Sequence, residues 1–247
     1  DMLRTLFWAL WFLCYLVGRL PLYWKAKRLQ KQGKKKEVDA VARGAAKKWG
    51  GLLLKHIGVK LTVEGCENLP PPDEPVVFVC NHQSYIDIPV LLAGLDFPRA
   101  LLARKEIGKV PLLRGWMDML GCVYVDREDS RAAMAALRAC EDLVKGGDSI
   151  IIFPEGTRSK SDAVGEYKGG AMRVAFRTKA PIVPLAISGS WRVLEGNDFK
   201  LKKADVRLTI MPMIQTAGME RDEQKALPKK LEELVRQTNG QQPVAGS

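Results

Sequence analysis

His82, one of only two histidines in the chain, lies five residues before Asp87 in the stretch "NHQSYID". A histidine beside a carboxylate can act as a general base, because the carboxylate fixes the tautomer and stabilises the imidazolium that forms. On one continuous helix, residues five apart point about 140° away from each other. The pair can therefore meet only where a strand turns into a helix and the first helical turn folds back onto the imidazole.

Asp87 also has a purely structural interpretation. Ser84 and Asp87 match the capping box, with Ser84 as the N-cap and the acidic residue three positions later. In that case Asp87 would satisfy the first turn of a helix and would have no part in chemistry.

A second polar cluster follows the apolar run of "SIIIFPEGTRS", which Pro154 ends. A glycine allows close backbone approach, and an arginine offers a fork of N–H donors that matches phosphate oxygens. The stretch therefore fits a phosphate site, although a plain turn with a solvated arginine is the alternative. The residues of this cluster are Glu155, Gly156, Thr157 and Arg158.

The elements that must position these clusters alternate between strands and helices from residue 61 onward. This alternation predicts an α/β fold with a central, largely parallel or mixed sheet flanked by helices. In such sheets the working residues gather where strands end. We predict strands at 61–64, 76–80, 100–103, 122–125, 150–153, 182–187 and 206–211, and helices at 85–94, 131–145, 171–179 and 222–238.

The N-terminal segment carries all of the net charge of the protein, which is +11. Residues 5–18 are uncharged and rich in aromatic side chains, and residues 25–36 hold seven basic residues and no acidic one. A run of 14 residues is short for a bilayer span, which needs about 20 apolar residues. The combination favours helices that dock on an anionic leaflet.

The domain organisation follows from this contrast in charge. We predict a two-helix membrane-binding motif in residues 1–57, joined near Gly33, an α/β domain in residues 58–240, and a flexible tail in residues 241–247. A secretory signal peptide and a helix packed only on its own domain are the alternatives for the first run. The remaining basic and acidic residues balance, so no nucleic-acid partner is expected.

The cysteines predict neither a disulfide framework nor a zinc site, because no CxxC pair occurs and most lie in apolar stretches. With two histidines in the chain, no metal is expected either. The five cysteines are Cys14, Cys66, Cys80, Cys122 and Cys140.

Four stretches occur in order at predicted strand ends: "NHQSYID", "GCVYVDR", "FPEGTRS" and "VPLAISG". Together they resemble the four sequence blocks of the glycerolipid acyltransferases, specifically the 1-acyl-sn-glycerol-3-phosphate acyltransferases, over roughly residues 59–211. The resemblance implies transfer of an acyl group from a thioester to the sn-2 hydroxyl of lysophosphatidic acid, which makes phosphatidic acid.

The resemblance also implies roles for residues. His82 would be the base and Asp87 its partner, with no acyl-enzyme, since "SGSW" lacks the pattern of a nucleophile elbow. Glu155, Gly156 and Arg158, with Thr157 between them, would belong to the glycerophosphate site.

Further cations are expected near the acceptor. The second block makes Arg127 a candidate for acceptor binding, and Lys105 precedes that block. The family often has an aromatic-Lys-Lys-Gly string after the third block. Here "YKGG" keeps Lys168 and replaces the second cation with Gly169. The second block has Val123 and Tyr124 where a bulky aliphatic-aromatic pair is common in the family.

The expected co-substrate is an acyl thioester of coenzyme A or of acyl carrier protein, and no other cofactor is expected. The expected partners are lysophosphatidic acid and an anionic leaflet, on the cytoplasmic face of the inner (plasma) membrane, with monotopic attachment. The carrier, the chain-length preference and the oligomeric state stay open. Glycerol 3-phosphate or another lysophospholipid is an alternative acceptor, and a non-catalytic protein that binds anionic lipids is the alternative from another class.

Overall fold

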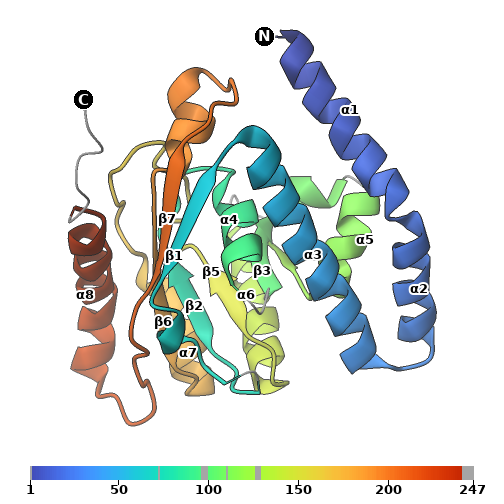
Figure 1. Ribbon diagram of the computed structural model, residues 1–247. Helices are drawn as coiled ribbons and strands as arrows, with labels where there is room; N and C mark the ends of the chain where they lie inside the picture. Colours follow the sequence, from blue (N-terminus) through green and yellow to red (C-terminus); the bar gives the residue numbers. More distant parts are fainter. Residues whose placement is uncertain (1, 72, 96–99, 110, 126–128, 241–247) are drawn as a thin grey trace.

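A computed structural model describes residues 2–71, 73–95, 100–109, 111–125 and 129–240 (Figure 1). The predicted tail, residues 241–247, lies outside this range. Each of the predicted strands is present, with ends that differ by one or two residues at most. The strands are β1 Lys60–Glu64, β2 Val77–Cys80, β3 Ala100–Arg104, β4 Val123–Val125, β5 Ile150–Ile152, β6 Ile182–Ser188 and β7 Asp205–Ile210.

The described strands form one sheet with the order β1-β7-β6-β2-β5-β3-β4. Neighbours pair in parallel except β6 and β7, which are antiparallel. The predicted fold class, an α/β fold with a largely parallel or mixed sheet, is therefore confirmed. The carboxyl ends of β2, β5 and β6 meet at one edge of the sheet, so the segments that follow these strands are brought together there.

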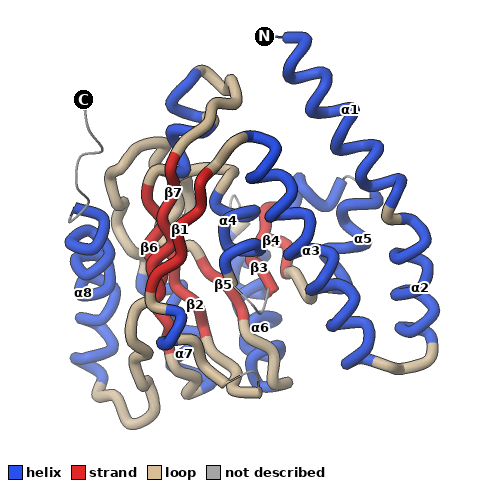
Figure 2. The backbone as a smooth tube through the Cα atoms, viewed as in Figure 1, coloured by secondary structure: helices blue, strands red, loops and turns tan. Residues whose placement is uncertain are grey.

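Helices cover both faces of the sheet, as Figure 2 shows. Helices α3 (Lys35–Ile57) and α4 (Asp87–Gly94) cover one face. The other face carries α6 (Ser130–Lys145), α7 (Gly169–Thr178) and α8 (Arg221–Gly240).

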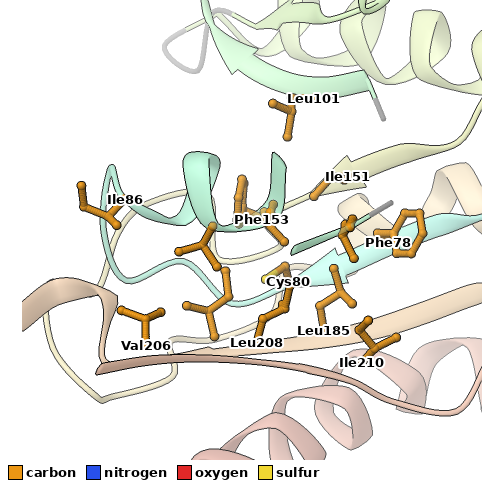
Figure 3. Packing of buried hydrophobic residues seen from close by; sticks show 14 of the residues in the cluster. Phe78, Cys80, Ile86, Leu101, Ile151, Phe153, Leu185, Val206, Leu208 and Ile210 are labelled. Carbon is orange, nitrogen blue, oxygen red and sulfur yellow. The ribbon is translucent and has the colours of Figure 1, made fainter. Parts of the chain in front are cut away.

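The central strands are apolar on both sides because each side faces a layer of helices. Phe78 and Cys80 of β2 point into the core beneath α3 and α4, where Figure 3 shows them beside Leu185 and Leu208. Val77 and Val79 of β2 point into the core on the opposite face of the sheet.

Helix α5 (Pro111–Met119) was not predicted from the sequence. It is only nine residues long and has Gly115 near its centre, which weakens the sequence signal for a helix. The glycine has a packing reason, since a Cβ at this position would lie 2.5 Å from the hydroxyl of Tyr23. Contact with α2 therefore favours this short helix.

The N-terminal segment forms three helices, α1 (Met2–Gly18), α2 (Leu20–Lys31) and α3, where the sequence predicted two. The predicted joint near Gly33 is present, and its φ of 71° suits glycine. The additional break falls at Arg19, just before Pro21, which has no N–H to continue the helical ladder. Ala26 of α2 and Trp116 of α5 share a small buried cluster, so this segment is packed on the body.

Helix α3 lies very close to α4, the helix that carries the site. A Cβ at Gly50 would lie 2.7 Å from the carbonyl oxygen of Pro89, so no larger residue fits at this crossing without a shift. The N-terminal helices are therefore connected through α3 to the element that begins with Asp87. Among the described residues, no helix combines the length and the apolar character that crossing a bilayer requires.

Candidate active site

The predicted pair of His82 and Asp87 is formed. The imidazole Nδ1 of His82 lies 2.7 Å from Oδ2 of Asp87, which is fully buried at the first position of α4. The same oxygen accepts the backbone N–H groups of Gln83, at 2.7 Å, and Ser84, at 2.9 Å. The segment between β2 and α4 thus folds the carboxylate back onto the histidine, as the spacing predicted.

These contacts determine which nitrogen of His82 can act. A carboxylate oxygen that accepts two N–H groups is an acceptor for the imidazole as well, so the ring proton lies on Nδ1. Nε2 then carries the lone pair that a general base needs. The ring of Phe153 stacks on the imidazole with centroids 4.1 Å apart, which restricts its rotation.

The capping interpretation of Asp87 is correct in part. Helix α4 begins at Asp87, two residues later than predicted, and its N-cap residue, Ile86, makes no capping bond with its side chain. The bond from Ser84 N–H to Asp87 is the returning half of a capping box. The hydroxyl of Ser84 instead accepts the N–H of Ile86 and donates to Glu195. Asp87 therefore orders the turn and holds the histidine with the same oxygen.

Glu155 connects the first and third motifs. One carboxylate oxygen accepts the backbone N–H of His82 at 2.7 Å, and the other accepts that of Gly165 at 3.0 Å. Burial raises the pKa of the Glu155 carboxyl above its ordinary value, and the two N–H donors oppose this rise. With both oxygens engaged by backbone groups, Glu155 holds loops in place, and its contact with a substrate stays a prediction.

Gly156 and Lys168 lie next to each other in the third motif region. Gly156 has a φ of 72°, and a Cβ there would lie 3.3 Å from Nζ of Lys168. The N–H of Lys168 donates to the carbonyl of Pro154 at 3.1 Å, which places this exposed lysine at the start of the turn. Thr157 is also exposed. The structure thus brings together the predicted glycine and the predicted cation.

Arg158 is the predicted phosphate ligand that lies nearest the first motif. Its guanidinium carbon lies 3.4 Å from the centroid of the Tyr85 ring, and its Nη1 lies 3.0 Å from Oε1 of Glu195. The loops of the two motifs are also bonded directly, since Ser159 N–H donates to the carbonyl of His82 at 2.8 Å. Arg158 is therefore ordered beside the dyad.

Two other cations were predicted for this site. Arg127 lies outside the residues that the structure describes. Lys105 is exposed and begins the short 3₁₀ helix after β3. It does not line the cavity that contains His82 and Arg158.

Sequence reasoning missed three residues that hold the site in place. Asn81 bonds through its amide to both backbone groups of Ile187, at 2.9 and 2.7 Å, which fixes the end of β2 to β6. The hydroxyl of Ser190 donates to Oδ1 of Asp87 at 2.5 Å. Glu195 is the third. The polar stretch "SGSW" after the sixth predicted strand was the signal for Ser190, since strand ends gather functional residues, whereas Glu195 had no comparable signal.

A cavity of about 430 Å³ is lined by His82 and by residues of the N-terminal helices. His82, Tyr85, Thr157 and Arg158 form one polar part of its wall, and Tyr15 and Arg19 of the N-terminal segment add polar groups as well. The rest is mostly apolar and comes from α1, α3, α4, α5 and β3. Such a cavity fits a flexible hydrocarbon chain with its polar end at the dyad.

Comparison with known proteins identifies the family. A family model described as "Acyltransferase" matches residues 60–188, which is more than half of the chain. The chain belongs to the acyltransferase family. The matched residues of this acyltransferase contain the dyad, Glu155 and Arg158, and they end at Ser188, before Ser190 and Glu195.

Curated relatives and a solved structure agree with this assignment. The acyltransferase is 38% identical over 167 residues to the chloroplastic 1-acyl-sn-glycerol-3-phosphate acyltransferase BAT2 of Brassica napus, over 67% of this chain and 48% of the relative. It is 38% identical over 168 residues to chloroplastic LPAT1 of Arabidopsis thaliana, over 67% and 46%. The chain thus spans about half the length of these relatives. The crystal structure of the 1-acyl-sn-glycerophosphate acyltransferase PlsC from Thermotoga maritima is similar, with a TM-score of 0.77, 25% identity and 95% coverage of both chains.

The acyltransferase offers no metal-binding cluster in the part of the chain that the structure describes, where no three His, Cys, Asp or Glu side chains converge suitably. Its five cysteines are free, and Cys80, Cys122 and Cys140 are buried. Burial raises the pKa of the Cys122 thiol to about 11, which keeps it protonated at neutral pH.

Proposed function

We propose that this acyltransferase transfers a fatty acyl group from a thioester to the sn-2 hydroxyl of lysophosphatidic acid and so makes phosphatidic acid. The observation that carries the proposal is the His82–Asp87 pair, whose histidine lines a largely apolar cavity together with Arg158. The names of the similar proteins, which are acyltransferases for 1-acyl-sn-glycerol 3-phosphate, support the same acceptor.

The proposed reaction needs one base and no covalent enzyme intermediate. Nε2 of His82 takes the proton of the acceptor hydroxyl as its oxygen attacks the thioester carbonyl. The C–O bond forms, the C–S bond breaks when the tetrahedral intermediate collapses, and the imidazolium returns the proton to the departing thiolate. Asp87 stabilises the imidazolium between the two proton transfers.

The two substrates divide the site by polarity. The apolar walls of the cavity suit an acyl chain, because hydrocarbon leaves water there at a gain of about 0.8 kcal/mol per CH₂ group. Arg158 suits the phosphate of the acceptor, and Lys168, on the other side of Gly156, adds a second positive charge to the same motif region.

The test is a transfer assay with radiolabelled lysophosphatidic acid and two donors, acyl-coenzyme A and acyl carrier protein charged with the same chain. Labelled phosphatidic acid is the expected product, and the donor that supports it identifies the carrier. Parallel reactions contain glycerol 3-phosphate or lysophosphatidylcholine. Transfer to one of these acceptors and none to lysophosphatidic acid would replace the proposed acceptor.

Substitution of Arg158 by alanine is expected to raise the KM for lysophosphatidic acid and to leave the KM for the donor nearly unchanged. Loss of a charge-assisted hydrogen bond to phosphate costs about 1.5–3 kcal/mol, which is about 10- to 100-fold in affinity. Steady-state kinetics with each substrate varied in turn measures both constants. Arg177→Ala is the matched control, since Arg177 pairs with Glu141 away from the site. A rise in the donor KM alone would mean that the donor occupies this pocket.

Attachment to a single leaflet is the second part of the proposal, and α1 and α2 carry it. Phe7, Leu10 and Val17 are more than half exposed on α1, at spacings of three and seven residues that place them along one face. Trp24 is 65% exposed on α2, near the basic residues of that helix. Of the seven predicted cations, Lys34 and Lys35 pair with acidic side chains, which leaves fewer for the lipid surface than predicted.

The double substitution Leu10→Glu and Val17→Glu is expected to weaken binding to vesicles by at least 10-fold. Each apolar side chain of this kind gains about 1.5–3 kcal/mol on leaving water, and a carboxylate reverses that gain. The measurement is co-sedimentation with vesicles of phosphatidylcholine and phosphatidylglycerol. Point substitutions are preferred to deletion of α1 and α2, because deletion would uncover the cluster around Ala26.

The control for this prediction is Leu234→Glu, which changes a partly exposed leucine of α8, on the opposite side of the molecule (Figure 1). Equal loss of binding in the control, or full binding by the double variant, would contradict docking through α1. Protease protection of tags at both ends in sealed vesicles tests the topology. Tags on the same side agree with a single leaflet, and tags on opposite sides contradict it.

A further inference from the structure

The connection between β6 and β7 lies directly beyond the residues that the family model matches. It contains two short 3₁₀ helices, Ser190–Val193 and Glu195–Asn197. Because β6 runs parallel to β2 and β5, the connection leaves the sheet at the edge where the site is formed, toward the top of Figure 1. Its residues can therefore reach the site although they are about 100 positions away from His82 in the sequence.

Glu195 makes contacts with both motifs at once. Its side chain is 1% exposed. Oε1 accepts the backbone N–H of Tyr85 at 3.0 Å and Nη1 of Arg158 at 3.0 Å, and Oε2 accepts the hydroxyl of Ser84. The three donors to this buried carboxylate come from two other segments of the chain. Its hydrogen bonds therefore compensate for its burial and connect these segments.

We propose that Glu195 is a positioning residue for acceptor binding, which holds the guanidinium of Arg158 beside the dyad. The proposal rests on the proposed function, in which Arg158 contacts the phosphate of lysophosphatidic acid. Arginine has a long, flexible side chain, and a fixed orientation reduces the entropy that phosphate binding would otherwise cost. Glu195 fixes one edge of the guanidinium through Nη1, and the ring of Tyr85 supports its face.

The same carboxylate also fixes the turn that carries the base. Ser84 and Tyr85 lie between His82 and Asp87, and Glu195 bonds to both of them. One side chain thus connects Arg158 to the turn that carries the base, in addition to the direct bond from Ser159 to His82. Ser190, five residues earlier, bonds to Asp87 and extends this support to the dyad.

An alternative role for Glu195, as a simple counterion of Arg158, predicts the opposite effect on acceptor binding. If the carboxylate were only a counterion of Arg158, it would compete with the phosphate, and its removal would strengthen acceptor binding. Three substitutions separate the roles. Glu195→Ala removes the contacts, Glu195→Asp keeps the charge and withdraws it from Arg158, and Glu195→Gln keeps the length and removes the charge.

Positioning predicts that Glu195→Ala and Glu195→Asp raise the KM for lysophosphatidic acid by about 10- to 100-fold, the loss expected for a misplaced charge-assisted bond. Glu195→Gln retains an oxygen that can accept from Arg158 and Tyr85, so its KM should stay within about three-fold of that of the wild type. The KM for the thioester donor should stay constant in each of the three variants. If Glu195→Ala fails to fold, Glu195→Asp carries the test.

Two controls separate this role from general stabilisation. Glu141→Ala removes another buried carboxylate that pairs with an arginine at 3.0 Å, between α6 and α7. Asp162→Asn loosens the β6–β7 connection itself, because Asp162 binds Trp191 and Arg192 at 2.9 Å but does not touch Arg158. Both controls should keep the acceptor KM of the wild type.

An acceptor KM that is unchanged or lowered in Glu195→Ala and Glu195→Asp overturns the proposal, as does an equal rise in Asp162→Asn. A wild-type protein that transfers nothing to lysophosphatidic acid contradicts the proposed function instead. The two failures are therefore distinguishable in the same experiment.

Discussion

Substitution of His82 by alanine is expected to lower kcat by about 10²–10⁴-fold, the usual contribution of a general base. Nδ1 is held by Asp87, so Nε2 is the nitrogen available for the acceptor hydroxyl, and alanine supplies nothing in its place. The fold should persist, because the side chain is partly exposed and Glu155 binds the backbone N–H of residue 82, which alanine retains. The measurement is kcat with lysophosphatidic acid, together with thermal unfolding and vesicle binding.

The second histidine provides the matched control. His56 lies on α3, where its Nδ1 is 2.7 Å from the carbonyl oxygen of Leu52, and His56→Ala should keep kcat close to that of the wild type. A folded His82→Ala protein with normal turnover would show that the base is another group.

Substitution of Asp87 by asparagine is expected to lower kcat by about 10²–10⁴-fold as well, with a smaller loss of stability. The amide carries no charge to stabilise the imidazolium. Only one of its two ends can accept, whereas the carboxylate accepts at Oδ2 from His82, Gln83 and Ser84 and at Oδ1 from Ser190. The single-turnover rate at saturating substrates measures the chemical effect without contributions from binding.

A cap without a catalytic role would give a different result. The expected result would then be normal turnover and a loss of less than about 1 kcal/mol of folding free energy, because asparagine caps a helix nearly as well as aspartate. Asp129→Asn provides that reference in the same protein, since Asp129 caps α6 by accepting the N–H groups of Arg131 and Ala132. Kinetics of Asp87→Asn that resemble those of Asp129→Asn would contradict the catalytic assignment of the aspartate.

The sheet and the dyad were predictable from the sequence because their signals are local. The central strands β2, β5 and β6 are short, continuous apolar runs because both of their faces are buried, whereas β1 and β7 alternate in burial along their length. The pairing of His82 with Asp87, five positions later, depends on the short turn between the end of β2 and the start of α4. The division of the N-terminal segment at Arg19 was missed because apolar character continues on both sides of it.

The remaining parts of the site depend on contacts between distant segments. Arg158 was predicted as a cation for phosphate, which stays a prediction, and its partner Glu195 is 37 residues away along the chain. Ser190 lies 103 residues from Asp87, and this contact exists only because β6 pairs with β2. No local pattern specifies such a pairing. The sequence therefore indicated the candidate site residues but not the distant side chains that bond to them.

The hydrogen bonds between Asn81 and Ile187 affect the order in which the parts of the site form during folding. The dyad can form within one short turn, but the bonds that fix it join residues separated by 73 to 107 positions. Contacts of such sequence separation close large loops and form slowly. During synthesis, a nascent chain that ends after β5 already contains both members of the dyad but lacks Asn81's partner strand. We therefore expect the dyad to gain its full support late in synthesis, once β6 has paired with β2 and brought Ile187 and Ser190 to the site.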